Sequence, residues 1–190
     1  MIMRRLSIFV EGAKDKLFFD RILRPELENN YNYIEIIEYS QEEIKWEYIN
    51  DFINSIKSTD CGYKKIGPNW AYDYIFIADI DNSPCITAKK EELRRRFPNL
   101  EQNKIIIVVK EIESWYLAGL DEKACRKLRI GCFNKTDDIM KEHFESIYYK
   151  SIHARRPITE FYLNIIENYR IDIAKEKNKT FKYFCDKFSI

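Results

Sequence analysis

The sequence predicts a three-layer α/β protein with a four-stranded, mainly parallel sheet, followed by a helical C-terminal extension. Four apolar runs, at residues 6–11, 33–40, 72–81 and 104–110, alternate with helix patterns over the first 112 residues. Continuous apolar strands separated by helices are typical of a parallel sheet that is buried on both faces. After residue 112 only helix patterns remain. We therefore expect an α/β domain at 1–118 and a helical extension at 119–190 that packs on it.

Apolar spacing predicts the helices one by one. The first covers residues 14–23, with Pro25 expected to end it. Residues 41–58 carry an apolar stripe at Ile44, Tyr48, Phe52 and Ile56. A charged helix is expected at 87–97 and a loop at 60–70. The C-terminal helices are expected at 112–120, 136–149, 157–170 and 180–188.

The composition suits a globular protein and gives little bulk signal for a partner. Of the 190 residues, 45% are hydrophobic and 33% are charged, and the net charge is +1. Residues 150–190 hold nine Lys/Arg and five Asp/Glu, a local charge of +4. Such a basic segment can contact phosphate, and the alternative is a solvated helix face.

The cysteine and histidine content argues against a zinc site. The chain has five cysteines without a CxxC pair, of which Cys125 and Cys132 are the closest in sequence, and only two histidines. We expect a reduced, cytoplasmic protein. No apolar run is long enough to span a membrane, and neither a P-loop nor GxGxxG is present.

Acidic residues follow three of the predicted strands. Glu11 ends the first strand, the run ADIDN ends the third, and KEIES ends the fourth. Ligands of parallel α/β sheets bind outside the carboxyl ends of the strands. We expect Asp79 and Asp81 to share one face, because residues two apart in an extended chain point the same way. Asp15, in the first turn of the next helix, can face the same side, and Gly12 is expected to allow a tight turn and a close partner.

Carboxylates brought close together need a proton or a cation to offset their repulsion. Oxygen ligands from Asp and Glu suit Mg²⁺ or Mn²⁺ rather than zinc. The alternative is that each acid by itself caps a helix or lies at the surface. Acids at three strand ends favour the metal hypothesis.

Three segments resemble the TOPRIM domain. FVEGAKDKLFFDRIL resembles its first motif, a strand ending in Glu-Gly, and IFIADIDN resembles its second, a strand ending in Asp-x-Asp. VVKEIESWYLAGL resembles a segment of the small stand-alone TOPRIM-like proteins related to the OLD-type nucleases, and the final NKTFKYFCDKF resembles their ending. The resemblance implies a Rossmann-like TOPRIM fold and a nuclease that hydrolyses phosphodiester bonds in DNA or RNA.

The resemblance also implies roles for individual residues. Glu11 would be the acid/base residue or a metal ligand, and Asp79 and Asp81 would bind Mg²⁺ or Mn²⁺. Asp15 matches the second acid of the first motif in OLD-type nucleases, which use two metal ions. Glu111 and Glu113 are alternatives for a further metal ligand.

Such nucleases also place a basic residue near the scissile phosphate. The candidates are Lys110, Arg155, Arg156 and Lys179. Arg94 and Arg95, in the run of three arginines at 94–96, are candidates for contacts with nucleic acid, although a solvated helix end is the simpler explanation.

The chain departs from the larger TOPRIM proteins. It has no room for a topoisomerase tyrosine domain and carries no primase zinc module. The ATPase of an OLD nuclease is also absent, since there is no P-loop. The resemblance therefore implies a separate ATPase partner of the ABC or AAA type, as in anti-phage defence pairs. A non-catalytic TOPRIM-like module that binds metal or a partner is the alternative, and nucleotidyl or phosphoryl transfer is a third possibility.

Overall fold

The structure, a computed structural model, describes residues 2–40, 46–57 and 70–190. In this part of the chain, packing defines two compact units. Unit 1 comprises Met1–Ala78 and Asn82–Ile107, and unit 2 comprises Asp79–Asp81 and Val108–Ile190. These units differ from the predicted domains, whose boundary lies after residue 118, because unit 2 already begins at Val108 and includes Asp79–Asp81. The predicted boundary stays a prediction.

The fold class is α/β, as predicted, and its sheet is entirely parallel. The four strands are β1 (Met3–Val10), β2 (Tyr33–Glu38), β3 (Trp70–Asp79) and β4 (Ile105–Val108). They lie in the order β2-β1-β3-β4. The register pairs Phe9 of β1 with Ile37 of β2 and with Phe76 of β3. The central strands are nearly continuous buried apolar runs because helices cover both faces of the sheet.

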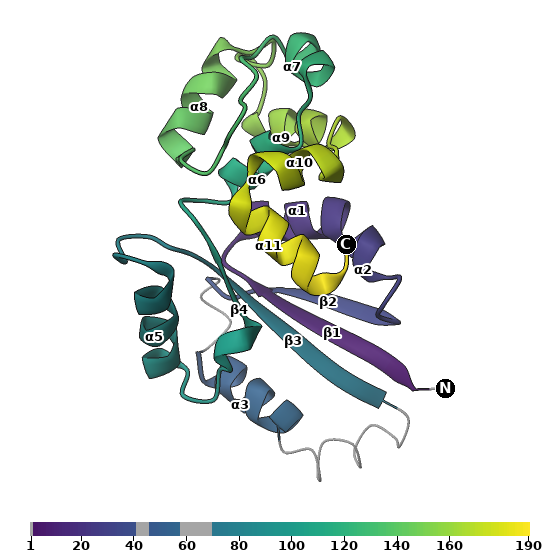
Figure 1. The fold of residues 1–190 in the computed structure, drawn as a ribbon, viewed down its shortest axis with the longest axis vertical. Helices are drawn as coiled ribbons and strands as arrows, with labels where there is room; N and C mark the ends of the chain where they lie inside the picture. The colour runs from purple at the N-terminus through teal and green to yellow at the C-terminus, as the bar shows by residue number, and fades with distance from the viewer. Residues whose placement is uncertain (1, 41–45, 58–69) are drawn as a thin grey trace. The chain divides into compact units, whose positions relative to one another are not determined.

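Helices of unit 1 form the outer two layers (Figure 1). They are α1 (Ala13–Phe18), η1 (Phe19–Leu23), α2 (Arg24–Leu27), α3 (Trp46–Lys57), α5 (Ile86–Arg96) and the short η2 (Gln102–Lys104). Figure 1 shows α1 and α2 on one side of the sheet and α3 and α5 on the other. Phe9 packs edge-on against Phe52 of α3 at 5.5 Å, and Phe76 lies 5.4 Å from Phe97 at the end of α5. These ring pairs join the sheet to one helical layer.

Pro25 does not end the first helix, so that prediction is wrong. The helix continues through η1, a π-helical turn, into α2, and Pro25 lies in the first turn of α2. The N–H of Arg24 bonds to the carbonyl of Phe19, five residues back, which widens the turn just before the proline. Pro25 cannot donate a backbone N–H, and the helix passes this position without that bond.

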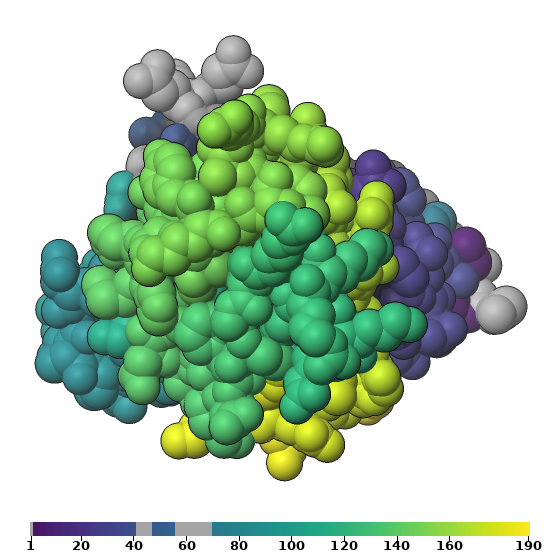
Figure 2. Space-filling view, turned by 90° about the horizontal axis from the view of Figure 1, so that it is seen from above, coloured from purple at the N-terminus to yellow at the C-terminus, as the bar shows by residue number. Residues whose placement is uncertain are grey.

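Unit 2 consists mainly of short helices. They are α6 (Glu113–Ala118), α7 (Glu122–Leu128), α8 (Lys141–Lys150), α9 (Ile158–Glu167), α10 (Ile171–Lys177) and α11 (Lys179–Phe188). Figure 2 shows the surface of segments of this unit, with α7, α8 and α9 in teal to lime green. In the core, Trp115 packs against Phe181 at 5.2 Å and Phe144 stacks on Tyr162 at 4.8 Å.

The sequence predictions for unit 2 are partly wrong. Helices α7 and α10 were not expected, and α8 begins at Lys141 rather than at residue 136. The reason for the late start is Thr136, which is buried, donates its backbone N–H to Lys177 and accepts a side-chain bond from Asn178. These bonds hold the chain before α8 in a non-helical form. Residues 41–45 and 58–69, which contain part of a predicted helix and most of a predicted loop, lie outside the described residues.

Candidate functional site

Glu11 directly follows the carboxyl end of β1. Its backbone carbonyl accepts the N–H of Ser40 at 3.1 Å, and the carbonyl of Val10 accepts the N–H of Tyr39 at 2.9 Å. The backbone around Glu11 is therefore held by the chain that follows β2. Its side chain is half-buried.

Asp15 has a structural task at the start of α1. The backbone N–H of Gly12 donates to Oδ2 of Asp15 at 3.1 Å, and Asp15 is buried with 7% of its surface exposed. A carboxylate in the first turn satisfies an N–H that lacks a helical acceptor and interacts favourably with the helix dipole. The helix-cap alternative for Asp15 is therefore realised in the structure.

Gly12 is not required by a tight turn, so that expectation is wrong. Its φ of −148° and ψ of −173° are extended angles that any residue adopts. An added Cβ would come no closer than 3.9 Å to Asp15 or Ser40, which is ordinary contact. The structure thus has space for a Cβ atom at position 12, although the residue there is glycine.

Asp79 and Asp81 occupy different backbone environments. Asp79 is the last residue of β3, and the N–H of Ile80 still bonds to the carbonyl of Val108 at 3.0 Å. Asp81 is exposed, and its φ of +48° is in the left-handed region, which Asp tolerates better than most residues. The extended chain therefore ends before Asp81, and the argument that alternation puts both carboxylates on one face does not hold.

The chain turns sharply between β4 and α6. Lys110 has a φ of +67°, a conformation uncommon for a lysine. The next residue, Glu111, accepts the backbone N–H of Lys141 through Oε2 and so caps the start of α8. Burial raises the pKa of Glu111, as do the nearby charges of Glu113 and Glu142, while the bond from Lys141 opposes the shift.

Glu113 lies in the interior of unit 2. It is the first residue of α6, has 3% of its surface exposed, and accepts the hydroxyl of Tyr162 at 2.7 Å. Burial and the charge of Glu113 raise the pKa of Tyr162 above its ordinary value, so the phenol remains a donor to this carboxylate. Glu111 and Glu113 are thus neighbours with separate contacts.

The six candidate acids are divided between the two units. Glu11 and Asp15 belong to unit 1, whereas Asp79, Asp81, Glu111 and Glu113 belong to unit 2. Within residues 2–40, 46–57 and 70–190, no group of three or more His, Cys, Asp or Glu side chains is arranged to hold a metal ion. The donor set of the acids consists of oxygens alone, which is the chemistry that Mg²⁺ and Mn²⁺ prefer.

Arg94 and Arg95 are exposed in the last turn of α5. Positive charge there is favourable to the helix dipole without any ligand. Arg94 also borders an open hollow of about 580 Å³ in unit 1, together with Lys90, Gln102 and Asn103.

Arg155 and Arg156 are exposed between α8 and α9. Arg156 pairs with Glu160 at 3.3 Å, and its backbone carbonyl accepts the hydroxyl of Tyr148. An exposed ion pair of this kind contributes little to stability. The guanidinium groups of both arginines are exposed to solvent.

Lys179 lies with other lysines that the sequence analysis did not single out. A hollow of about 620 Å³ in unit 2 is lined by Lys135, Asp172, Lys175, Glu176, Lys179 and Lys182. Lys135 donates to the carbonyl of Glu176 at 2.7 Å, which holds its ammonium group in place. The basic character of residues 150–190 was the only sequence signal for this cluster. It could not indicate Lys135, which lies outside that segment.

Comparisons with protein-family models, curated proteins and solved structures gave no match to the chain. Among the described helices, none has the length and apolar character needed to cross a membrane.

Proposed function

We propose that the protein is a magnesium-dependent nuclease of the TOPRIM type that hydrolyses phosphodiester bonds in DNA or RNA. The observation that carries this proposal is the strand order. It makes β1, β3 and β4 neighbours in a parallel sheet, and these are the strands that acidic residues follow. Carboxyl ends of parallel neighbours lie at the same edge of a sheet, which is where α/β proteins bind their ligands.

The acids fit a hard divalent cation in their chemistry. Glu11 follows β1, and Asp79 is the last residue of the adjacent strand β3. These two residues would hold Mg²⁺ or Mn²⁺, with Asp81 and Glu111 as further ligands. Asp15, whose Oδ2 accepts the N–H of Gly12, would be a further ligand. Glu113 is the weaker candidate because its carboxylate is buried against Tyr162. We therefore favour Glu111 over Glu113.

The residues of the chain would divide the chemistry as follows. A bound pair of ions would activate water and stabilise the leaving oxygen. Glu11 would accept the proton of the attacking water. Lys110, whose left-handed backbone directs the chain out of β4, would bring an ammonium group to the scissile phosphate.

The lysine-lined hollow supports a nucleic acid as the substrate. Four ammonium groups and two carboxylates line it, so its formal charge is 4 − 2 = +2. Lysine contacts to phosphates are the usual source of sequence-independent affinity for nucleic acids. A separate ATPase partner, a role in phage defence and a cytoplasmic location rest on the resemblance to stand-alone TOPRIM proteins.

The test is metal-dependent cleavage of plasmid DNA, single-stranded DNA and tRNA in Mg²⁺, Mn²⁺ or EDTA. Wild type is compared with Glu11→Gln, Asp79→Asn and the control Glu122→Gln, which alters an exposed acid on α7. Asp15→Asn and Asp15→Ala form a second pair, because asparagine retains an acceptor for the N–H of Gly12 and alanine does not.

We expect cleavage that needs metal, survives in Glu122→Gln and disappears in Glu11→Gln and Asp79→Asn. Cleavage that persists in EDTA or in both site variants would contradict the proposal. A folded protein that binds Mn²⁺ and cuts none of the substrates, alone or with a candidate ATPase, would support the non-catalytic metal-binding module instead.

A further inference from the structure

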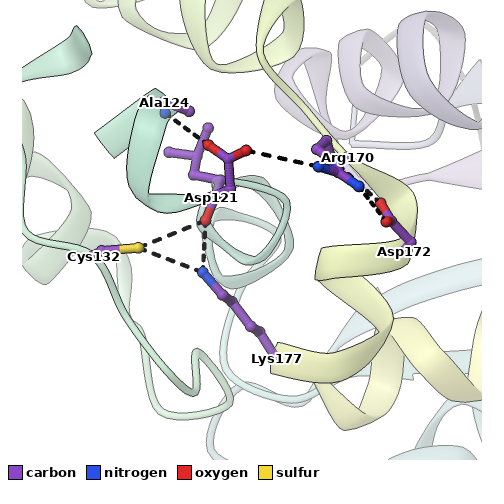
Figure 3. A network of polar contacts seen from close by, with 7 residues as sticks. Asp121, Ala124, Cys132, Arg170, Asp172 and Lys177 are labelled. Atoms are coloured by element: carbon purple, nitrogen blue, oxygen red, sulfur yellow. Dashed lines mark hydrogen bonds and ion pairs between the residues drawn. The ribbon is translucent and has the colours of Figure 1, made fainter. Parts of the chain in front are cut away.

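Cys132 lies at the surface of unit 2, in the loop that follows α7 (Figure 3). Its Sγ is 3.8 Å from the backbone carbonyl of Leu120 and 3.6 Å from Nζ of Lys177. The same Lys177 ammonium donates to the carbonyl of Leu120 at 2.6 Å. Lys177 is therefore held between the carbonyl and the sulfur by two contacts, and it can pair with a thiolate at Cys132.

Cys125 lies next to Cys132 because the chain reverses at the end of α7. Arg129 adopts a left-handed conformation with a φ of +55°, and the N–H of Ile130 bonds back to the carbonyl of Cys125 at 3.0 Å. This is a helix ending that returns the following residues towards the last turn. The thiol of Cys125 interacts with that of Cys132, and Cys125 itself is buried.

The two thiols differ in a way that separates their chemical tasks. Burial, followed by the interaction with Cys132, raises the pKa of Cys125 to about 12, so this cysteine stays a protonated thiol. Cys132 is exposed and has a cation beside it. Exposure and a neighbouring lysine are the features of cysteines that react first with oxidants, so we assign the first step to Cys132.

We propose that Cys132 is a site of reversible oxidation by hydroperoxides and that Cys125 resolves the product to an intramolecular disulfide. The Cys132 thiolate attacks the outer peroxide oxygen, an S–O bond forms, the O–O bond breaks, and the alcohol or water leaves with a proton from solvent. Cys125 then gives its proton to the hydroxyl group of the Cys132 sulfenic acid as its sulfur attacks, the S–O bond breaks, the S–S bond forms, and water leaves. The cysteines are oxidised and the peroxide is reduced. This inference is independent of the proposed nuclease activity.

The test is treatment of the reduced protein with hydrogen peroxide, followed by mass spectrometry of the peptides with and without dimedone, a trap for sulfenic acid. In wild type we expect a linked Cys125–Cys132 peptide that dithiothreitol removes. In Cys125→Ser we expect a dimedone adduct on Cys132. The internal control is Cys85, which is also exposed and accepts the backbone N–H of Ala88 at 3.5 Å as the N-cap of α5. We expect the linked peptide to contain Cys132 and not Cys85, because Cys125 interacts with the thiol of Cys132.

Variants of Lys177 separate its electrostatic effect from a purely structural one. Lys177→Met should slow the oxidation of Cys132 by about threefold, whereas Lys177→Arg should keep most of the rate because the positive charge remains. Circular dichroism checks that both variants are folded. A linked peptide that contains Cys85 instead of Cys132, or a wild-type Cys132 adduct that never forms the link to Cys125, would overturn the proposal.

Discussion

Trp115 donates its indole N–H to the hydroxyl of Thr180 at 2.9 Å, and 65 positions in the sequence separate the two residues. Thr180 in turn donates to Oδ1 of Asn178 at 2.9 Å. The side-chain amide of Asn178 reaches Ser114 and Thr136. This buried network joins the start of α6 to the start of α11 and gives a physical reason for the Trp of the ESW segment and the Asn and Thr of the NKTF segment.

Thr180→Val should destabilise the protein, because valine has a similar shape and removes the acceptor of a buried indole N–H. The expected loss in the free energy of unfolding is about 1–3 kcal/mol. Urea unfolding followed by tryptophan fluorescence measures it. Thr180→Ser, which keeps the hydroxyl, should lose clearly less, and equal losses in the two variants would show that the hydroxyl contributes no more than the methyl group.

Gly119→Ala should destabilise unit 2 through a clash. A Cβ at Gly119 would lie 2.4 Å from two ring carbons of Tyr169, whose hydroxyl is held by the carbonyl of Trp115 at 3.0 Å. Because the ring is anchored, we expect a loss of about 1–3 kcal/mol, as for overpacked cores. Gly131→Ala is the matched control, since a Cβ there meets nothing within 4 Å. Similar melting temperatures for the two variants would contradict this account.

Ser7→Ala should leave the stability unchanged or raise it. Ser7 is fully buried in β1, and its hydroxyl has no hydrogen-bond partner in the described part of the chain. Burying an unsatisfied hydroxyl is unfavourable, and alanine removes that cost while leaving only a small loss of volume. Chemical unfolding measures the change, and a loss above about 1 kcal/mol would mean that the hydroxyl has a partner in the folded protein.

Asp121→Asn should make the melting temperature less dependent on pH. Asp121 caps α7 by accepting the N–H of Ala124 at 2.8 Å, and its Oδ2 is 3.8 Å from Arg170 (Figure 3). The backbone bond from Ala124, with a further contribution from Arg170, lowers the pKa of Asp121 below its ordinary value of 3.8. A lowered carboxyl pKa stabilises the fold above the unfolded value, and this stabilisation is lost as the pH falls through the folded value.

The difference in melting temperature between wild type and Asp121→Asn should therefore be largest near neutral pH and shrink below about pH 4. Asparagine keeps a capping oxygen, so the difference reports the charge alone. A difference that is constant across the titration would contradict the assignment.

Gly12→Ala should fold normally and lose activity if the proposed nuclease site is correct. The backbone at Gly12 is extended and an added Cβ has only ordinary contacts, so the stability should change by less than about 1 kcal/mol. A methyl group beside Glu11 would instead occupy the space that an approaching phosphate or hydrated ion needs. Thermal unfolding and the cleavage assay, run on the same preparation, separate the two effects, and full activity would show that this space is not used.

Much of the fold was predictable because local patterns and burial agree there. The apolar runs predicted as strands at 6–11 and 72–81 are β1, which ends at Val10, and β3, which ends at Asp79. Their composition indicates this because a parallel sheet buries both faces. The helix at 87–97 is confirmed as α5, with an error of one residue at each end. The position of acids after β1 and β3 also follows from the sequence alone.

Tertiary structure decided what local patterns do not encode. A wide turn carries the first helix past Pro25, and a buried Thr136 delays the start of α8, because contacts made elsewhere in the chain outweigh intrinsic preference. Contacts made elsewhere in the chain also decide the surroundings of the acids. Asp81 lies in a left-handed turn, whereas Glu113 is buried and accepts the Tyr162 hydroxyl. The sequence by itself determined which residues carry charge and which strands are buried. The order of the strands and the environment of each carboxylate depend on pairings between distant segments, whose energies no local window of sequence contains.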